Sequence, residues 1–140
     1  MGMTLHVDIV SAEQEIFSGT AEMVFAPAIM GEVGIAPRHT QMLTPLKAGE
    51  VRVRTKGSEE QTFYVSGGML EVQPHVVTIL ADTAMRAKDI DEAAAIKAKE
   101  HAEHALAGKK TEMDYARATA ELAEAIAQLR TLERIRKKKK

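Results

Sequence analysis

Residues 76–98 read VVTILADTAMRAKDIDEAAAIKA, and the chain changes physical character within this stretch. All ten valines, all four prolines and eight of the nine glycines lie before Asp82. Residues 86–140 instead contain fourteen alanines and a single glycine, Gly108. Valine, glycine and proline are typical of short strands and turns, whereas unbroken alanine, leucine, lysine and glutamate favour long helices. The stretch therefore predicts a β domain over residues 1–85 and a helical domain over residues 86–140.

Short runs of alternating apolar residues fill the first domain. Leu5, Val7 and Ile9 alternate with polar neighbours, and Val51 and Val53 flank an arginine. Glycine and proline turns separate these runs, and no helix of about ten residues fits between them. The pattern predicts an antiparallel sandwich or a flattened barrel, and it excludes repeated strand–helix–strand units.

The second domain has the pattern of two helices joined by a turn. Asp89 followed by Glu92 has the form of a capping box, and Gly108 favours a left-handed end to the first helix. Thr111 with Asp114 then begins the second helix. The fold class is therefore predicted to be α+β, with a β-sandwich followed by an antiparallel two-helix hairpin.

Each predicted helix carries a stripe of alanines on one face. The first stripe is Ala95, Ala98, Ala102 and Ala105, and the second is Ala116, Ala120, Ala123 and Ala127. Because an alanine buries little area, and burial is worth ~25 cal/mol per Å², we expect the hairpin to be weakly held. A further stripe of larger side chains needs another partner; it consists of Leu122, Ile126 and Leu129.

The net charge of −1 hides an asymmetry between the domains. Residues 1–85 contain five Lys and Arg against ten Asp and Glu, whereas residues 86–140 contain fourteen against ten. The basic excess gathers at Arg130, Arg134, Arg136 and Lys137–Lys140. A solvated helix end, an anionic lipid or nucleic acid contact and an acidic protein target all remain open for this run.

Composition excludes several classes of function. Cysteine is absent, so there are no disulfides, thiolate metal sites or catalytic thiols. Aromatic residues make up 4% of the chain, which is poor in the platforms that single-stranded nucleic acids stack on. No secretory signal or run of about 18 apolar residues is found. We therefore expect no nucleic acid partner, and membrane association only through another protein.

Motifs for catalysis are weak. Residues 31–34, GEVG, lack the lysine of a phosphate-binding loop, and residues 66–68, SGG, are better explained as a tight turn between strands. His101 and His104 lie three residues apart without a third metal ligand at a suitable spacing. The residues alone indicate an interaction protein with no catalytic residues, no metal and no cofactor. A nucleic-acid adaptor using the lysine tail and a metal enzyme using the histidines are the rival classes.

Several blocks in order carry a resemblance to a known family. Residues 31–39 read GEVGIAPRH, residues 66–72 SGGMLEV and residues 80–86 LADTAMR, and the last predicted helix contains DYA, AELA and AQLR beginning at 114, 120 and 127. Residues 10–14, VSAEQ, and 17–19, FSG, also fit. The chain resembles, over nearly its whole length, the epsilon subunit of bacterial F-type ATP synthases.

The resemblance implies a fold and a function. It implies a sandwich of about ten strands joined to a two-helix hairpin, in a noncatalytic subunit of the rotating central stalk. The sandwich would bind the gamma subunit and the membrane ring of c subunits, and so couple proton flow to ATP synthesis. The subunit would lie peripherally on the cytoplasmic face of the bacterial plasma membrane, within the complex. The hairpin would fold on the sandwich or extend along gamma, where it inhibits ATP hydrolysis.

The resemblance also implies roles for particular residues. Ring contacts fall on one loop, at Glu32, Arg38 and His39. The C-terminal helix would contact the catalytic alpha and beta subunits. Its inhibitory contact, with an acidic segment of a beta subunit, falls on Arg130, Arg134 and Arg136. The hinge between the domains falls on the segment from Asp82 to Lys88, including Arg86.

A nucleotide site is the weakest of these implied sites. Some family members bind ATP through an Ile/Leu-Asp-x-x-Arg-Ala motif. Asp91 matches this motif, but Ala94 replaces its arginine. Because alanine offers no donor to a phosphate, we expect weak or absent ATP binding.

Overall fold

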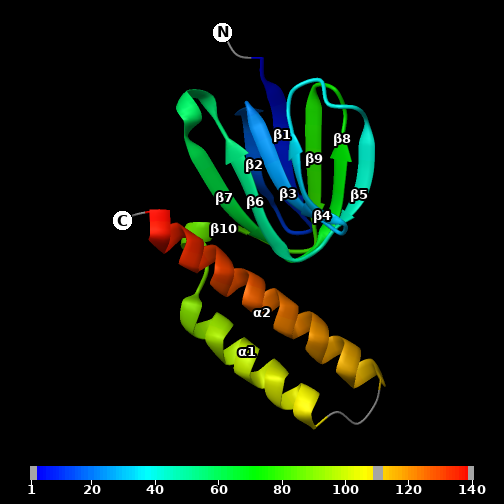
Figure 1. Cartoon of the computed structure of the whole chain (residues 1–140), viewed down its shortest axis with the longest axis vertical. Coiled ribbons are helices and arrows are strands. Elements are labelled where there is room, and N and C mark those ends of the chain that lie inside the picture. The colour runs from blue at the N-terminus through cyan, green and yellow to red at the C-terminus, as the bar shows by residue number, and fades with distance from the viewer. Residues whose placement is uncertain (1–2, 109–111, 139–140) are drawn as a thin grey trace. The chain divides into compact units, whose positions relative to one another are not determined.

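The computed structural model describes residues 3–108 and 112–138. It divides the chain into two compact units, Met1–Arg86 and Ala87–Lys140 (Figure 1). The strands described in the first unit are β1 (Leu5–Ser11), β2 (Glu15–Ala21), β3 (Met23–Ala28), β4 (Gly31–Ile35), β5 (Met42–Leu46), β6 (Gly49–Arg54), β7 (Glu60–Val65), β8 (Gly68–Val72), β9 (Val76–Ala81) and β10 (Ala84–Arg86), with a short 3-10 turn, η1 (Lys56–Ser58), between β6 and β7. The second unit contains η2 (Ala87–Asp89), α1 (Glu92–Ala107) and α2 (Glu112–Lys138).

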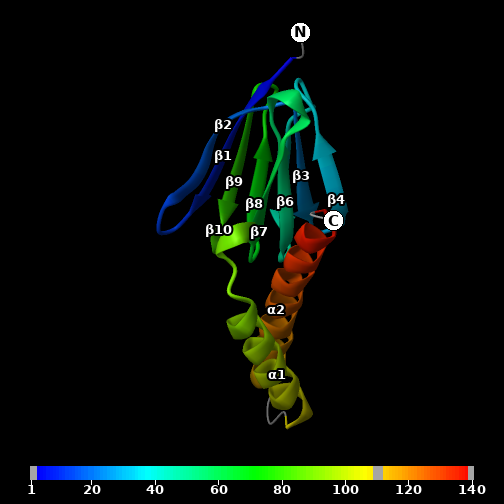
Figure 2. The same cartoon turned by 90° about the vertical axis from the view of Figure 1, so that its left-hand side faces the viewer.

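The strands form a folded sheet with two layers. Hydrogen bonds follow the order β10-β7-β6-β3-β5-β8-β9-β1-β2, with β4 beside β3. Among the described strand pairs, Ala28 with Leu46 alone joins β3 to β5, so the sheet turns there into a second layer. Figure 2 shows β1, β2 and β9 on one side of the unit and β3, β4 and β6 on the other. The predicted β-sandwich followed by two helices is confirmed.

One pairing could not be read from the alternation of residues. All described pairs are antiparallel except β1 and β9, which run parallel with Val7 opposite Val77 and Ile9 opposite Ile79. Alternation marks which side of a strand is buried, but it is the same for either strand direction. The parallel pair brings the first strand of the unit against one of its last.

The core lies between the two layers. Leu5, Val7 and Ile9 point into it at 2% exposure or less, while His6 and Asp8 point outward. Burying a side chain of this size stabilises the fold by about 1.5–3 kcal/mol relative to leaving it in water. The predicted alternation is therefore what holds the sandwich together.

The predicted tight turn at residues 66–68 is confirmed between β7 and β8. Gly67 and Gly68 have φ angles of 130° and 137°, which L side chains rarely adopt. The carbonyl of Gly67 accepts a 3.0 Å hydrogen bond from Asp82, and the Ser66 hydroxyl accepts a 2.9 Å bond from the amide of Thr83. These bonds fasten the β7–β8 turn to the β9–β10 turn.

The ends of α1 differ from two details of the prediction. The N-cap is Asp91, whose carboxylate accepts a 3.2 Å hydrogen bond from the amide of Ala94. Asp89 instead lies in η2, so the capping box predicted there is wrong. Gly108 ends the helix as predicted, but its φ of −104° is not left-handed. Thr111, predicted to begin the second helix, lies outside the described residues, and so does the side chain of Asp114.

The helices of the hairpin pack through alanines spaced seven residues apart. On α1, Ala95 and Ala102 are buried, in agreement with two positions of the predicted stripe. On α2, the buried alanines are Ala118 and Ala125.

The stripe predicted for α2 is wrong. Ala116, Ala120 and Ala123 are exposed. Alanines are so frequent in α2 that they form more than one stripe. The buried alanines have a leucine four residues further along, Leu122 or Leu129, so their side of the helix offers more apolar area.

Candidate partner-binding surfaces

The outward side of one layer carries a row of apolar side chains. Cross-strand register places Pro45 opposite Met69, Met69 opposite Leu80 and Leu80 opposite Val10. Leu43 lies two residues before Pro45 on the same side of β5. Leu43 is 68% exposed and Leu80 is 52% exposed. We call these five residues the apolar row, and exposed apolar side chains that gather in this way are a candidate binding surface for another protein.

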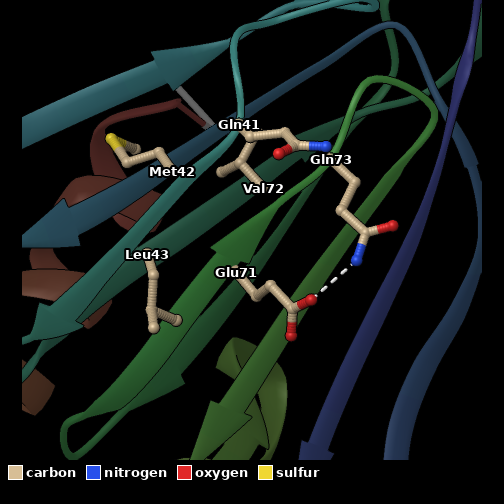
Figure 3. Close-up of a pocket in the computed structure, with 6 residues that line it drawn as sticks. All are labelled: Gln41, Met42, Leu43, Glu71, Val72 and Gln73. Carbon is tan, nitrogen blue, oxygen red and sulfur yellow. Dashed lines mark hydrogen bonds between the residues drawn. The ribbon is translucent and has the colours of Figure 1, made fainter.

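Polar groups lie alongside the apolar row. Leu43 is opposite Glu71, Glu71 is opposite Thr78 and Thr78 is opposite Asp8. A shallow surface pocket begins here, lined by Gln41, Met42, Leu43, Glu71, Val72 and Gln73. Figure 3 shows Glu71 and Gln73 joined by a 2.7 Å hydrogen bond on one side of this pocket, with Leu43 on the neighbouring strand. An apolar centre with a polar margin is the arrangement found in protein–protein interfaces.

A serine, a histidine and an aspartate also meet on this side of the sheet. The Ser18 hydroxyl donates to Oδ1 of Asp8 at 2.7 Å, and Nε2 of His6 lies 3.0 Å from the same oxygen and 3.2 Å from the hydroxyl. In a catalytic triad the imidazole uses its two nitrogens to link the hydroxyl and the carboxylate. Here one nitrogen faces both groups and the serine donates directly to the aspartate, so the cluster does not activate a nucleophile.

The three predicted ring contacts do not lie together. Residues 31–35 form β4, so the expectation of one loop from Glu32 to His39 is wrong. Glu32 is opposite Pro27, beside the β3–β4 turn. The amide of Arg38 donates to the carbonyl of Pro74, which places Arg38 and His39 beside the β8–β9 turn at the other end of the strands. Ala28, beside the β3–β4 turn, is opposite Leu46 at one end of β5. Met42, at the other end of β5, is opposite Val72, beside the β8–β9 turn.

The β3–β4 turn carries two exposed apolar side chains that sequence reasoning missed. Ile29 is 58% exposed and Met30 is 95% exposed. Gly31 follows with a φ of 132°, which lets the chain reverse into β4 and Glu32. The turn is held in place by a 3.0 Å hydrogen bond from the amide of Ile29 to the carbonyl of Pro45. Adjacent exposed side chains at a fixed turn offer a second contact surface.

The three arginines near the end of α2 divide into two groups. Arg130 and Arg134 are exposed and lie four residues apart, on one side of the helix. Arg136 pairs with Glu92 at the start of α1, across the hairpin. The hydrogen bond to Glu92, followed by its negative charge, raises the pKa of Arg136 above its ordinary value. The side chains of Lys137–Lys140 lie outside the described residues.

The predicted hinge residues belong to different units. Asp82 lies in the β9–β10 turn, and Arg86 ends β10. The Arg86 guanidinium donates to the carbonyl of Ile16 and to Oε1 of Gln61, both at 3.2 Å, and its carbon lies 5.5 Å from the centre of the Phe63 ring. These contacts fasten Arg86 to the sandwich. Lys88 lies in η2, beyond the boundary between the units.

The residues considered for nucleotide and metal binding have ordinary structural positions. One carboxylate oxygen of Asp91 is engaged in capping α1, and Ala94 is exposed beside it. His101 and His104 are both exposed on α1. Among residues 3–108 and 112–138 no group of three or more side chains is placed to hold a metal ion. No helix in the same ranges is both long and apolar enough to cross a membrane.

Comparisons with known proteins cover both units. Residues 4–87 match the family model "ATP synthase, Delta/Epsilon chain, beta-sandwich domain", and residues 88–133 match "ATP synthase, Delta/Epsilon chain, long alpha-helix domain". The chain is 69% identical over 138 residues to the ATP synthase epsilon chain of Nitrosococcus oceani, covering 99% of both chains. It is 68% identical over 137 residues to epsilon chain 1 of Methylococcus capsulatus, covering 98% of both.

A solved structure has the same fold at low sequence identity. A chain in the Euglena gracilis mitochondrial ATP synthase, in a structure of its OSCP, F1 and c-ring, matches with a TM-score of 0.82 and 20% identity. The match covers 92% of this chain and 81% of that one. On the family models and the bacterial relatives, the chain belongs to the family of epsilon chains of bacterial F-type ATP synthases.

Proposed function

We propose that this chain is a noncatalytic rotor subunit that couples gamma to the c-ring during proton-driven ATP synthesis. It lies peripherally on the cytoplasmic face of the bacterial plasma membrane, within the complex. The apolar row is the observation that carries this proposal, because its exposed apolar side chains offer a binding surface to a protein partner. Copurification of the tagged chain with gamma and c subunits from detergent-solubilised membranes tests it. A chain that purifies without gamma contradicts it.

The proposed gamma site is the apolar row with its polar margin. Burying a leucine side chain is worth about 1.5–3 kcal/mol, so Leu43 and Leu80 supply a hydrophobic anchor. Glu71 and Asp8 lie beside this anchor and favour partner groups that carry positive charge or donate hydrogen bonds. The layer beneath is held by buried side chains, so the surface binds without having to fold first.

The proposed ring contact is the β3–β4 turn with Glu32. Ile29 and Met30 offer apolar area at the tip, and Glu32 offers a carboxylate next to it. Because Arg38 and His39 lie at the other end of the strands, a ring that touches Glu32 does not reach them in the same patch. Arg38 and His39 are therefore not part of the proposed ring contact.

The helical hairpin is proposed to regulate ATP hydrolysis. Its helices meet through alanines, which gain little from burial, so neighbouring subunits can shift the balance between its conformations. The proposed hinge lies in η2, at Lys88, because Arg86 is fastened to the sandwich. Arg130 and Arg134 face the same way and are the proposed inhibitory contacts with an acidic segment of a beta subunit. Arg136 joins them only after its pair with Glu92 opens.

Replacing Arg130 and Arg134 together by alanine is expected to relieve inhibition while assembly stays intact. Two exposed charge contacts worth up to about 1 kcal/mol each correspond to a rise in hydrolysis of up to about thirtyfold. The measurement is the ATP hydrolysis rate of complexes reconstituted with the variant. Arg117→Ala, a change at an exposed arginine on the same helix, is the matched control. Unchanged hydrolysis in the double variant rules out the inhibitory contact.

ATP is proposed to bind this chain weakly or not at all. Ala94 supplies no donor to a phosphate, and Asp91 already accepts a hydrogen bond from the helix it caps. Isothermal titration of the full chain with ATP should therefore show no binding at micromolar concentrations. A micromolar dissociation constant would overturn this expectation and would favour regulation by bound nucleotide.

A further inference from the structure

An arginine on the outward side of the other layer gathers several acidic side chains. Nη2 of Arg52, on β6, lies 2.8 Å from Oε1 of Glu32 on β4. The same guanidinium lies 3.6 Å from Glu50 and 3.8 Å from Glu60. Its side chain is 18% exposed, compared with 49% for Glu32. The guanidinium therefore has one close hydrogen bond, to Glu32, and two longer ion pairs, while the carboxylate of Glu32 reaches the surface.

An aromatic ring lies against this guanidinium. The carbon of the Arg52 guanidinium lies 4.4 Å from the centre of the Phe25 ring, and register places Phe25 between Gly34 and Arg52. A Cβ built on Gly34 would lie 3.2 Å from the ring, so glycine leaves room for Phe25 against β4. Stacking on an aromatic face suits the planar arginine fork better than a lysine ammonium. The sequence motif GEVG thus serves an arginine–glutamate pair.

We propose that Arg52 is a positioning residue that sets the direction of the Glu32 carboxylate for its contact with the c-ring. This inference rests on the proposed ring contact. A free glutamate side chain samples several rotamers and loses that freedom on binding, whereas a carboxylate already held is ordered in advance. Arg52 takes Oε1, so Oε2 is the acceptor offered to a hydrogen-bond donor on a polar loop of the ring. Arg52 itself faces Phe25 and the acidic residues and acts only through Glu32.

The experiment measures how much the ring adds to the affinity of the full chain. The chain is titrated onto complexes depleted of it, with the ring present and with the ring removed. The dissociation constant without the ring, divided by the dissociation constant with the ring, is the ring contribution. Glu32→Gln is expected to lower this ratio about tenfold, as for loss of a charge-assisted hydrogen bond. Arg52→Gln is expected to lower it about fivefold, and Arg52→Lys by less, because lysine keeps the charge but not the fork.

The double variant separates a positioning role from a structural one. If Arg52 acts through Glu32, Arg52→Gln has no further effect on the ratio once Glu32→Gln is present. Arg54→Gln is the matched control, because Arg54 lies on the same strand and 5.4 Å from the same ring, and it should leave the ratio unchanged. Melting temperatures and affinity without the ring show whether each variant is folded.

Each result supports or overturns one of the two ideas. Losses that add in the double variant, or no loss in Arg52→Gln, overturn the positioning role and leave the ring contact of Glu32 in place. No loss in Glu32→Gln refutes the ring contact itself, and the positioning role with it. A loss in Arg52→Gln that is equal with and without the ring also overturns the inference, because it reports a general structural effect.

Discussion

Replacing Gly68 by alanine is expected to lower the free energy of unfolding of the sandwich by about 3 kcal/mol or more. Gly68 has a φ of 137°, and a Cβ built there lies 2.0 Å from the carbonyl oxygen of Leu80 and 2.8 Å from Cα of Ala81. Both are backbone atoms of the paired strand β9, so no side chain can rotate away to make room. Thermal and chemical unfolding followed by circular dichroism measure the loss.

Gly57 provides a control with a positive φ but no clash. Its φ is 83°, but nothing lies within 4 Å of the Cβ that alanine would add. Gly57→Ala is therefore expected to cost only the strain of a left-handed residue, about 1–2 kcal/mol. Equal losses for the two variants would contradict the clash between β8 and β9. Because the β8–β9 pair carries Met69 and Leu80, loss of the pairing would also remove the apolar row.

Replacing Leu80 by aspartate is expected to weaken binding to gamma about a hundredfold or more while the chain stays folded. Leu80 is 52% exposed, so a carboxylate there remains hydrated in the free chain. In the complex the same carboxylate would be buried in an apolar interface, and burying a polar group without partners costs several kcal/mol. Titration of the full chain onto assemblies that contain gamma but lack this chain measures the loss.

Two further variants show whether the effect is local. Met3→Asp makes the same kind of change at a residue that is 57% exposed before β1, and it should leave gamma binding intact. Ile79→Asp, at the neighbouring core position with 0% exposure, should unfold the sandwich. If Leu80→Asp binds gamma as well as the unchanged chain does, the apolar row is not the gamma site.

The fold class could be predicted because the two halves differ in residues with strong backbone preferences. Valine alternation marks the buried side of each strand, and glycines with positive φ mark the turns, as at residues 67 and 68. The alternation does not reveal strand direction, so the parallel pairing of β1 with β9 was not predicted. The buried side of α2 was also predicted wrongly, because alanines occur on several sides of that helix.

The candidate site was less accessible to sequence reasoning. The contacts predicted from sequence were charged residues expected in a loop, whereas the apolar row lies within strands. Its signal is present as apolar doublets, in which both sides of a strand are apolar: Leu70 faces the core and Met69 faces outward, and Ile79 and Leu80 behave in the same way. A doublet within an alternating strand indicates that its outer side also needs a cover.

The ring contacts were also predicted to lie together because they are close in sequence. Glu32 and Arg38 are six residues apart, but β4 is extended at about 3.3 Å per residue and carries them to different ends. The pairing of Glu32 with Arg52 joins residues twenty positions apart and depends on the register of β3 with its neighbours. Such pairs follow from the sheet order, which the sequence pattern alone did not reveal.

Cross-linking from single cysteines tests the arrangement of the sandwich between gamma and the ring most directly. The chain has no cysteine, so Leu80→Cys and Met30→Cys each provide one thiol for a photoactivatable reagent. After assembly and illumination, position 80 on the apolar row is expected to join gamma, and position 30 at the β3–β4 turn is expected to join a c subunit. A cross-link from position 80 to the ring, or none from position 80 to gamma, would contradict the proposed division between the two surfaces.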